Sequence, residues 1–187
     1  DNGEVRLLNP ADYETKHSYT FDVTASDGSL SDTKTITLNV ADINEVSIFT
    51  SLNTGLVDER ADITTVIYDA DATDPDNDTL TYSVSGTDAS YLTIDSDDGE
   101  VRLKESADYE TKDSYIFEVI ASDGFLIATK TITVDVNDIN EPPQISGLTS
   151  YYVFENELGA EVAMISVHDF EDGSSFSNPN LVYSIEE

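Results

Sequence analysis

Apolar and polar residues alternate with a period of two along most of this chain. Between residues 115 and 121, Tyr, Phe, Val and Ala alternate with Ile, Glu and Ile, and residues 131–136 read TITVDV. Leu80, Tyr82 and Val84 alternate with Thr and Ser in the same way. Such alternation, rich in Thr, Val, Ile and Tyr, is typical of half-buried β-strands. No segment has the apolar spacing of an amphipathic helix of useful length, so the pattern predicts an all-β fold.

Turn-forming stretches separate the expected strands at short intervals. They are rich in Asp, Asn, Gly and Pro, as in DPDND, SDDG, ASDG and NDINEPP. These residues favour turns because Gly reaches positive φ, Pro fixes φ, and Asp and Asn side chains bond to nearby backbone groups. About seven short strands between such turns are typical of one Greek-key β-sandwich.

The same segment occurs twice. ADYETK at residues 11–16 returns at residues 107–112, and both copies are followed by ASDG and then DINE. Residues 1–45 align with residues 97–141 without a gap, at a constant offset of 96 residues and with 31 identities in 45 positions. A tandem array of seven-stranded Greek-key β-sandwiches joined end to end is therefore expected. We interpret its parts as the C-terminal half of one repeat (1–45), a complete repeat (46–142) and the N-terminal half of a following repeat (143–187).

The charge balance excludes several classes of partner. The chain has 39 acidic and 8 basic side chains, a formal net charge of −31. A nucleic acid is not expected as partner, and an anionic membrane surface is disfavoured, because no basic patch is available. No Cys is present, and no apolar run approaches the roughly 18 residues that a membrane span needs. We therefore expect no disulfide and no direct membrane insertion. The chain starts at Asp1, and we expect it to be a piece of a longer protein.

The acidic residues gather in short motifs that lie between the strands and repeat in register. They supply hard oxygen donors, with almost no Lys or Arg nearby in the sequence to neutralise them. Ca²⁺ takes six to eight such oxygens in flexible geometry, whereas Mg²⁺ keeps more of its water. A transition metal would favour His or Cys ligands, and His17 and His168 are isolated. The motifs therefore predict Ca²⁺ as the bound ion.

The order of these motifs resembles the extracellular cadherin repeat. That family has a Glu near the first strand, then AxDxD, a DRE-like turn, AxD and a DxNDN-like linker. The matching stretches here are VDE (57–59), ATDPD (72–76), ADYE (107–110), ASD (121–123) and NDINEPP (137–143). The resemblance extends over the whole chain, and the pairing of ASDG with DINE without Cys is more similar to bacterial cadherin-like repeats than to animal ones.

The resemblance implies that Ca²⁺ ions lie where one repeat meets the next. At junction one, between the first and second repeats, the implied ligands are Asp12, Glu14, Asp42, Asn44, Glu45, Asp74, Asp76 and Asp123. At junction two, between the second and third, they are Glu59, Asp108, Glu110, Asp138, Asn140, Glu141, Asp169 and Glu171. Glu45 and Glu141 stand where the family linker usually has Asp, and the third unit has Asp-Phe-Glu in place of DxD.

Simpler interpretations of the acidic residues remain open. A solvated acidic surface would also be rich in Asp and Glu, although it would not repeat in register. The pair Asp108 and Glu110 could indicate a glycosidase, but both residues fit better as cation ligands. No GxSxG motif and no plausible Ser–His pair occur, so we do not expect an enzyme.

Two functions follow from the resemblance and the composition. The first is a calcium-binding extracellular cadherin-like repeat array, a stiff rod in cell-surface adhesion. Its partners would be other cadherin-like repeats of the same protein or a second copy, and the terminal half-repeats of two copies could complete one another. The alternative is a carbohydrate-binding module with a polysaccharide partner, for which tyrosines would supply stacking surfaces. The absence of Trp weakens that alternative.

Overall fold

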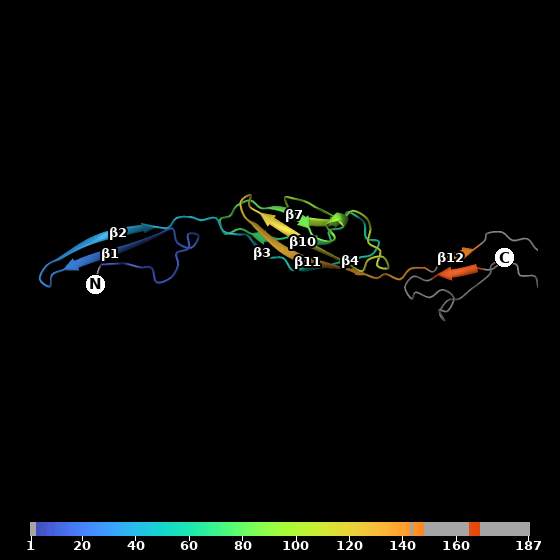
Figure 1. Cartoon of the computed structure of the whole chain (residues 1–187), viewed down its shortest axis with the longest axis horizontal. Helices are drawn as coiled ribbons and strands as arrows, with labels where there is room; N and C mark the ends of the chain where they lie inside the picture. Colours follow the sequence, from blue (N-terminus) through green and yellow to red (C-terminus); the bar gives the residue numbers. More distant parts are fainter. Residues whose placement is uncertain (1–2, 143, 148–164, 169–187) are drawn as a thin grey trace, which may run out of the picture.

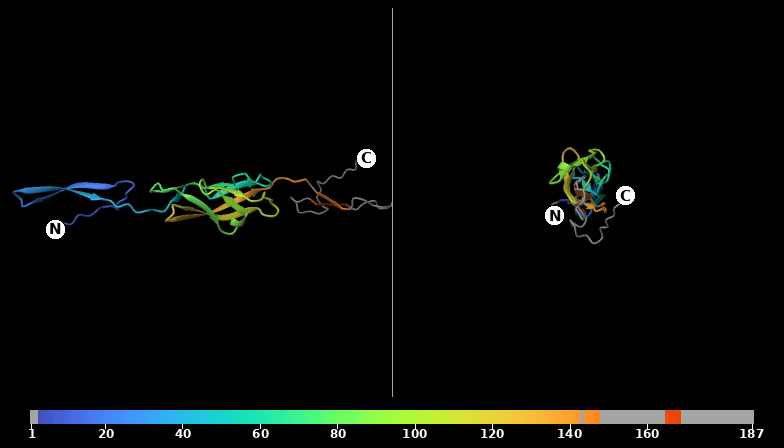
Figure 2. Two further views of the ribbon diagram at one scale, coloured as in Figure 1. Left: turned by 90° about the horizontal axis from the view of Figure 1, so that it is seen from above. Right: turned by 90° about the vertical axis from the view of Figure 1, so that its right-hand side faces the viewer.

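The computed structural model of the chain describes residues 3–142, 144–147 and 165–168. A β-hairpin and a separate pair of strands flank a central β-sandwich, and Figures 1 and 2 show the three parts one after another along the long axis. The first hairpin consists of β1 (Ser18–Ser26) and β2 (Ser31–Asn39), which pair with each other in antiparallel orientation over their whole length. In the last, β12 (Gln144–Gly147) pairs antiparallel with β13 (Ile165–His168).

One layer of the sandwich is a four-stranded sheet in the order β4-β11-β10-β7. β10 pairs antiparallel with both β11 and β7, whereas β4 runs parallel to β11. The strands of this layer are β4 (Thr54–Asp58), β7 (Thr81–Ser85), β10 (Ser114–Ser122) and β11 (Ile127–Asn137).

The second layer is built from shorter strands. It contains a three-stranded sheet in the order β5-β9-β8 and a separate pair β3-β6. A single 3₁₀ turn, η1 (Ala89–Tyr91), leads into β8. The strands are β3 (Ile48–Phe49), β5 (Tyr68–Asp69), β6 (Ala72–Thr73), β8 (Leu92–Ile94) and β9 (Glu100–Leu103). The predicted all-β sandwich is confirmed.

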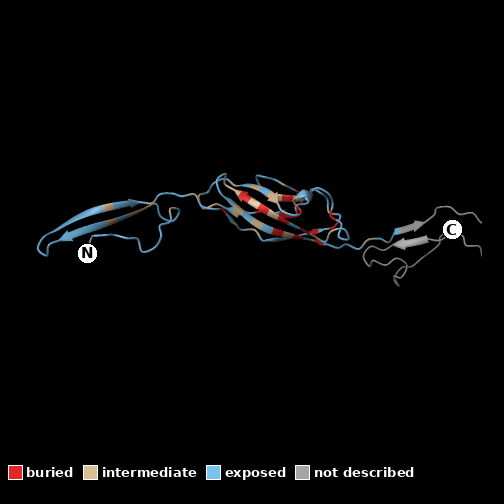
Figure 3. Cartoon of the chain, in the orientation of Figure 1, coloured by how far each residue is buried: buried red, intermediate tan, exposed pale blue. Residues whose placement is uncertain are grey.

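The core lies between the two layers, where alternate residues of β10 and β11 meet the second layer (Figure 3). Phe117, Val119, Ile132 and Val134 are almost completely buried. The ring of Phe117 meets that of Tyr68 edge-on, with centroids 6.2 Å apart. The period of two that predicted β10 and β11 therefore arises because one face of this sheet is buried and the other is not.

The first hairpin repeats the sequence of β10 and β11 but does not repeat their burial. Val23 and Leu38 are 41% and 42% exposed, whereas the matching Val119 and Val134 are at 0%. In Figure 3 the hairpin is exposed over most of its length. Within the described residues no second layer covers it. The division of the chain at residues 45 and 142 stays a prediction. In the described part of the chain, no helix is long and apolar enough to cross a membrane.

Candidate metal sites at the repeat junctions

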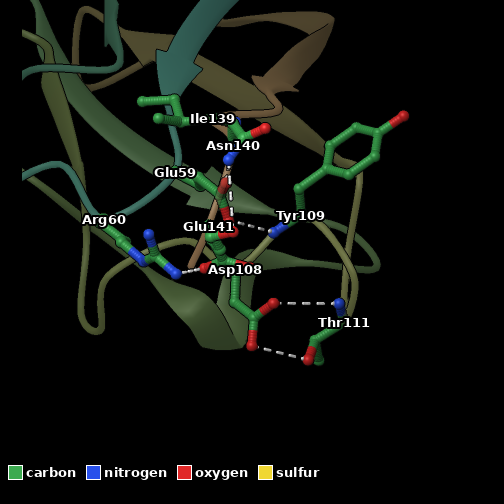
Figure 4. Close-up of polar contacts among 8 residues, drawn as sticks. All are labelled: Glu59, Arg60, Asp108, Tyr109, Thr111, Ile139, Asn140 and Glu141. Atoms are coloured by element: carbon green, nitrogen blue, oxygen red, sulfur yellow. Dashed lines mark hydrogen bonds and ion pairs between the residues drawn. The ribbon is translucent and has the colours of Figure 1, made fainter. Parts of the chain in front are cut away.

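The repeated ADYETK segment folds as a tight turn that is closed by its own Asp and Thr. Asp12 Oδ1 accepts a hydrogen bond from the backbone N–H of Thr15 at 2.9 Å, and Asp12 Oδ2 accepts one from Thr15 Oγ1 at 3.0 Å. Asp108 makes the same two bonds with Thr111, at 3.3 and 2.9 Å (Figure 4). The Asp of each copy therefore holds the turn in shape, and the Glu two positions later, Glu14 or Glu110, lies in a cluster of carboxylates.

Three carboxylates from three separate segments meet at junction one. The oxygens of Glu14, Asp42 and Asp76 all lie within 4.8 Å of one another. Glu14 comes from the first ADYETK turn, Asp42 from the linker, and Asp76 from the loop between β6 and β7 of the next repeat. Three negative charges this close repel one another unless a cation or protons intervene. This cluster lies where the first hairpin unit meets the central sandwich.

Two hydrogen bonds attach the linker to the sandwich at the same place. Asn44 Nδ2 donates to Asp123 Oδ2 at 2.8 Å, and the backbone N–H of Glu45 donates to Asp76 Oδ2 at 2.9 Å. Asp123 Oδ1 also accepts the backbone N–H groups of Phe125 and Leu126, each at 2.6 Å. The Asp of ASDG therefore closes the turn between β10 and β11 and anchors the linker.

Asp74 has one oxygen that suits a cation. Its Oδ1 accepts the backbone N–H of Asp76 at 3.0 Å and that of Asp78 at 3.3 Å. Its Oδ2 is buried and has no hydrogen-bond partner among the described residues. A buried carboxylate oxygen without a partner is costly, and a divalent cation coordinated there would remove that cost. The all-oxygen donor set at this junction is the type that Ca²⁺ prefers.

The electrostatic environment differs between two residues of this junction. Desolvation, followed by the charges of Glu14, Asp76, Asp42 and Asp12, raises the pKa of the Glu45 carboxyl above its ordinary value. The hydrogen bond from Asn44 lowers the pKa of Asp123, and the backbone N–H groups of the turn lower it further. Negative charge is therefore unfavourable at Glu45 and well satisfied at Asp123.

A second three-carboxylate cluster lies at junction two, where oxygens of Glu59, Glu110 and Glu141 are all within 4.8 Å of one another. Glu59 is only 2% exposed. Its Oε1 accepts the backbone N–H of Ile139 at 2.8 Å, and its Oε2 accepts that of Tyr109 at 3.3 Å (Figure 4). Glu59 thereby connects the end of β4 to the second ADYETK turn and to the linker.

A positively charged side chain also lies at this cluster. Arg60 forms an ion pair with Glu141 (Figure 4). Arg60 has a positive φ of 59°, and its backbone N–H donates to the carbonyl of Ala107 at 2.9 Å. Sequence reasoning missed Arg60, although it directly follows Glu59 and is one of only 8 basic residues in the chain.

The remaining predicted ligands of junction two lie in the linker or outside the described residues. Asp138 and Asn140 are exposed in the linker, and Asn140 Nδ2 donates to the carbonyl of Glu141 at 3.2 Å. Asp169 and Glu171 lie outside the described residues. The structure therefore brings together part of each predicted ligand set, from both sides of junction one and from one side of junction two.

Comparison with known proteins identifies the central sandwich. The family model of the cadherin domain matches residues 53–137. These residues form a cadherin domain. The match falls inside the segment that sequence analysis assigned to the complete repeat, and the predicted cadherin family is confirmed. The likeness to bacterial cadherin-like repeats stays a prediction.

Relatives of this cadherin domain align with most of the chain. Human Protocadherin Fat 1 is 34% identical over 98% of this chain, and human Cadherin-12 is 32% identical over 87% of it. The chain spans only 4% and 23% of the lengths of these two relatives. The similarity therefore concerns a part of each relative and does not by itself carry over what the whole proteins do.

Solved cadherin structures share the fold. Protocadherin Gamma B2 extracellular cadherin domains 1-5 superpose with a TM-score of 0.62 at 26% identity, covering 85% of this chain and 33% of that one. The Protocadherin gammaB7 EC3-6 cis-dimer structure gives a TM-score of 0.60 at 26% identity, covering 84% and 44%. The named relatives are cadherins and protocadherins.

Proposed function

We propose that this chain is part of a calcium-binding extracellular cadherin-like repeat array, and that it acts without catalysis as a calcium-stiffened rod in cell-surface adhesion. The observation that carries the proposal is the cluster of Glu14, Asp42 and Asp76. Its three carboxylates come from one repeat, the linker and the next repeat, so one ion bound among them would hold all three segments together.

The ligands that we propose come from the motifs and include residues that already accept hydrogen bonds. A carboxylate oxygen has two lone pairs, so Asp12, Asp108 and Asp123 can close their turns and coordinate a cation as well. At junction one the proposed ligands are Asp12, Glu14, Asp42, Asn44, Glu45, Asp74, Asp76 and Asp123. At junction two they are Glu59, Asp108, Glu110, Asp138, Asn140, Glu141, Asp169 and Glu171.

Stiffening follows from the electrostatics of the junction. Without a cation, the carboxylates of Glu14, Asp42 and Asp76 repel one another, and the hydrogen bonds of Asn44 and Glu45 hold the linker against the sandwich. With Ca²⁺ bound, the same carboxylates attract a shared ion. An ion that binds only the ordered junction stabilises it by RT ln(1 + [L]/Kd). The angle between consecutive repeats should therefore become fixed as calcium is added.

The biological setting is part of the proposal. The chain resembles repeats of cadherins and protocadherins, so we place it outside the cell or on its surface. Its partners are other cadherin repeats of the same protein and a second copy of the chain. Neither the described geometry nor the reported relatives favours the polysaccharide alternative, and we do not propose it.

Small-angle X-ray scattering of the chain in EDTA and in excess Ca²⁺ tests the proposal. Calcium should narrow the distribution of shapes and increase the maximum dimension. The triple variant Glu14→Gln, Asp42→Asn, Asp76→Asn should lose the effect at junction one. A control variant with the same change in charge at exposed positions, Asp32→Asn, Glu105→Gln, Asp135→Asn, should keep it. Identical scattering of the natural chain with and without calcium would refute the proposal.

A further inference from the structure

The Lys that ends the second ADYETK segment has no part in the sites described so far. Asp108 and Thr111 close the turn with each other, and Glu110 belongs to the carboxylate cluster of junction two. Lys112 is one of only 8 basic residues in a chain with a net charge of −31. A positive charge so close to a cation site opposes cation binding, so this Lys must contribute to the fold or to the site in another way.

The second ADYETK turn separates two hollows in the surface. One hollow is lined by Glu110 and the other two carboxylates of the junction-two cluster. The other hollow is lined by Lys112, Tyr91 and Tyr115. Asp108 lines both hollows. The side chain of Lys112 therefore lies on the opposite side of the turn from the carboxylate cluster.

Lys112 meets a buried carboxylate in its hollow. Its Nζ lies 3.0 Å from Asp88 Oδ1, and Asp88 is only 6% exposed. The other oxygen of Asp88 accepts the backbone N–H of Ile116 at 2.7 Å, and the backbone N–H of Asp88 donates to the carbonyl of Ile116 at 3.2 Å. Asp88 is thereby fixed to β10. Because a buried carboxylate needs a charged partner, its ion pair with Lys112 attaches the turn to the sandwich.

The ammonium group of Lys112 also lies over two aromatic rings. Its Nζ is 5.7 Å from the ring centroid of Tyr91 and 5.3 Å from that of Tyr115, and the two rings meet edge-on. At these distances a cation is attracted to the face of an aromatic ring. In the first copy, Lys16 Nζ lies 4.4 Å from the ring centroid of Tyr19, the residue that corresponds to Tyr115. The contact between the Lys and the Tyr three positions later is therefore part of the repeat.

We propose that Lys112 is a positioning residue for junction two, which attaches the second ADYETK turn to Asp88 and thereby holds Glu110 where it can coordinate Ca²⁺. The backbone N–H of Lys112 donates to the carbonyl of Asp108 at 2.9 Å, so the Lys is joined to the first acidic residue of the turn as well. A ligand that is held in place before the ion arrives loses less conformational entropy on binding. The inference rests on the proposed function for the identity of the ion.

A positioning role and a purely electrostatic role predict opposite results for Lys112→Met. The substitution removes the charge and keeps an unbranched side chain. If Lys112 acted only through its charge, the variant would bind Ca²⁺ more tightly, because the carboxylates would lose a competing cation. Loss of positioning predicts the reverse, about tenfold weaker binding at junction two, which is the usual effect of removing a residue that supports a metal ligand.

Isothermal titration calorimetry with Ca²⁺ measures the affinity. Every sample carries the triple variant Glu14→Gln, Asp42→Asn, Asp76→Asn, so that the titration reports junction two. The matched control is Lys104→Met, because Lys104 lines the same hollow but donates to the carbonyl of Ser90 and lies outside the turn. It should bind Ca²⁺ at least as tightly as the parent chain. Lys112→Arg keeps the charge and should restore most of the affinity that Lys112→Met loses.

Amide hydrogen exchange in EDTA tests the same role without calcium. The backbone N–H of Thr111 donates to Asp108 Oδ1, so its exchange rate reports how well the second turn is ordered. Lys112→Met should speed this exchange several-fold, because local opening of the turn becomes easier. The backbone N–H of Thr15, which makes the matching bond to Asp12 in the first turn, is the internal reference and should not change.

We expect Lys112→Met to weaken Ca²⁺ binding and to speed the exchange of Thr111, while Lys104→Met does neither. Equal or tighter Ca²⁺ binding by Lys112→Met would overturn the inference, and so would an unchanged exchange rate of Thr111. A natural chain that binds no Ca²⁺ would refute the proposed function. The exchange of Thr111 in EDTA would then still decide whether Lys112 holds the turn, so the two proposals fail separately.

Discussion

Asn44 Nδ2 lies 2.8 Å from Asp123 Oδ2, a contact between residues 79 positions apart in the sequence. The carboxylate of Asp123 also closes the turn between β10 and β11, and its counterpart Asp27 closes the turn between β1 and β2 through the backbone N–H groups of Ser29 and Leu30. One motif therefore has two roles in the second copy, because there the linker lies against it.

Replacing Asn44 by Ala should raise the pKa of Asp123 toward its ordinary value, because the first cause of the lowering is the Asn44 hydrogen bond. A lowered carboxyl pKa stabilises the folded state above the unfolded-state pKa, and this stabilisation is lost as pH falls through the folded-state pKa. Carboxyl titration by NMR measures the change. Asp27 is the internal control, because its pKa is lowered only by backbone hydrogen bonds of its own turn. An unchanged pKa of Asp123 would show that the Asn44 hydrogen bond is not the main cause of the lowered pKa.

Glu45 should have the opposite pH dependence. Its pKa is raised, first by desolvation and then by the neighbouring carboxylates, so its charge destabilises the junction at neutral pH and protonation relieves this as pH falls through the raised pKa. In EDTA at pH 7, Glu45→Gln should therefore unfold at a higher temperature than the natural chain. The difference should shrink toward pH 4, and the exposed control Glu105→Gln should show a smaller effect. A lower melting temperature for Glu45→Gln at pH 7 would count against this account.

Glu59 should matter for folding as well as for binding. Glu59→Ala removes the acceptor of two backbone N–H groups, those of Tyr109 and Ile139. We expect a loss of about 2–3 kcal/mol in the free energy of unfolding, even in EDTA, because two backbone N–H groups in part-buried hydrogen bonds lose their acceptor. Urea denaturation measures it. Glu110→Ala, in the same cluster but exposed, should cost much less in EDTA. Equal losses for the two variants would show that Glu59 has no special structural role.

Arg60 should weaken cation binding at junction two, because its guanidinium already neutralises Glu141. Arg60→Gln should tighten Ca²⁺ binding there by roughly tenfold, equivalent to about 1.4 kcal/mol. Isothermal titration calorimetry measures this. The matched control is Arg102→Gln, which removes the same charge from the ion pair with Glu100. Equal affinities for both variants would mean that Arg60 acts only through the overall charge of the chain.

The sandwich could be predicted from the sequence because one buried face imposes a strict period of two. Tyr115, Phe117 and Val119 are buried as that pattern requires. The parallel pairing of β4 with β11 could not be predicted, because it places Leu56 opposite Asp135, which lies far away in the sequence. Alternation shows which face of a strand is buried, but it does not show which strand lies beside it.

Part of the candidate sites could also be predicted from the sequence, because their residues belong to recurring motifs. The duplication identified Glu14 and Asp42, because Glu110 and Asp138 follow them in register 96 residues later, whereas Asp76 was identified by the resemblance of ATDPD to the AxDxD motif. The hydrogen bonds of Asp12 to Thr15 had a signal in the three-residue spacing of ADYETK, which is typical of a capped turn. The ion pair between Arg60 and Glu141 could not be predicted from the sequence, because it depends on side-chain conformations that the order of residues does not specify.

The measurement that tests the central claim most directly is thermal unfolding of the chain in excess EDTA and then across a Ca²⁺ titration, with Mg²⁺ as the control. The account predicts a large rise in melting temperature with Ca²⁺ and a much smaller one with Mg²⁺, because ions that bind the folded junctions stabilise them. The triple variant Glu14→Gln, Asp42→Asn, Asp76→Asn should lose part of that rise. An unchanged melting temperature at saturating Ca²⁺ would show that the repeated carboxylates are a solvated surface, and would contradict the account.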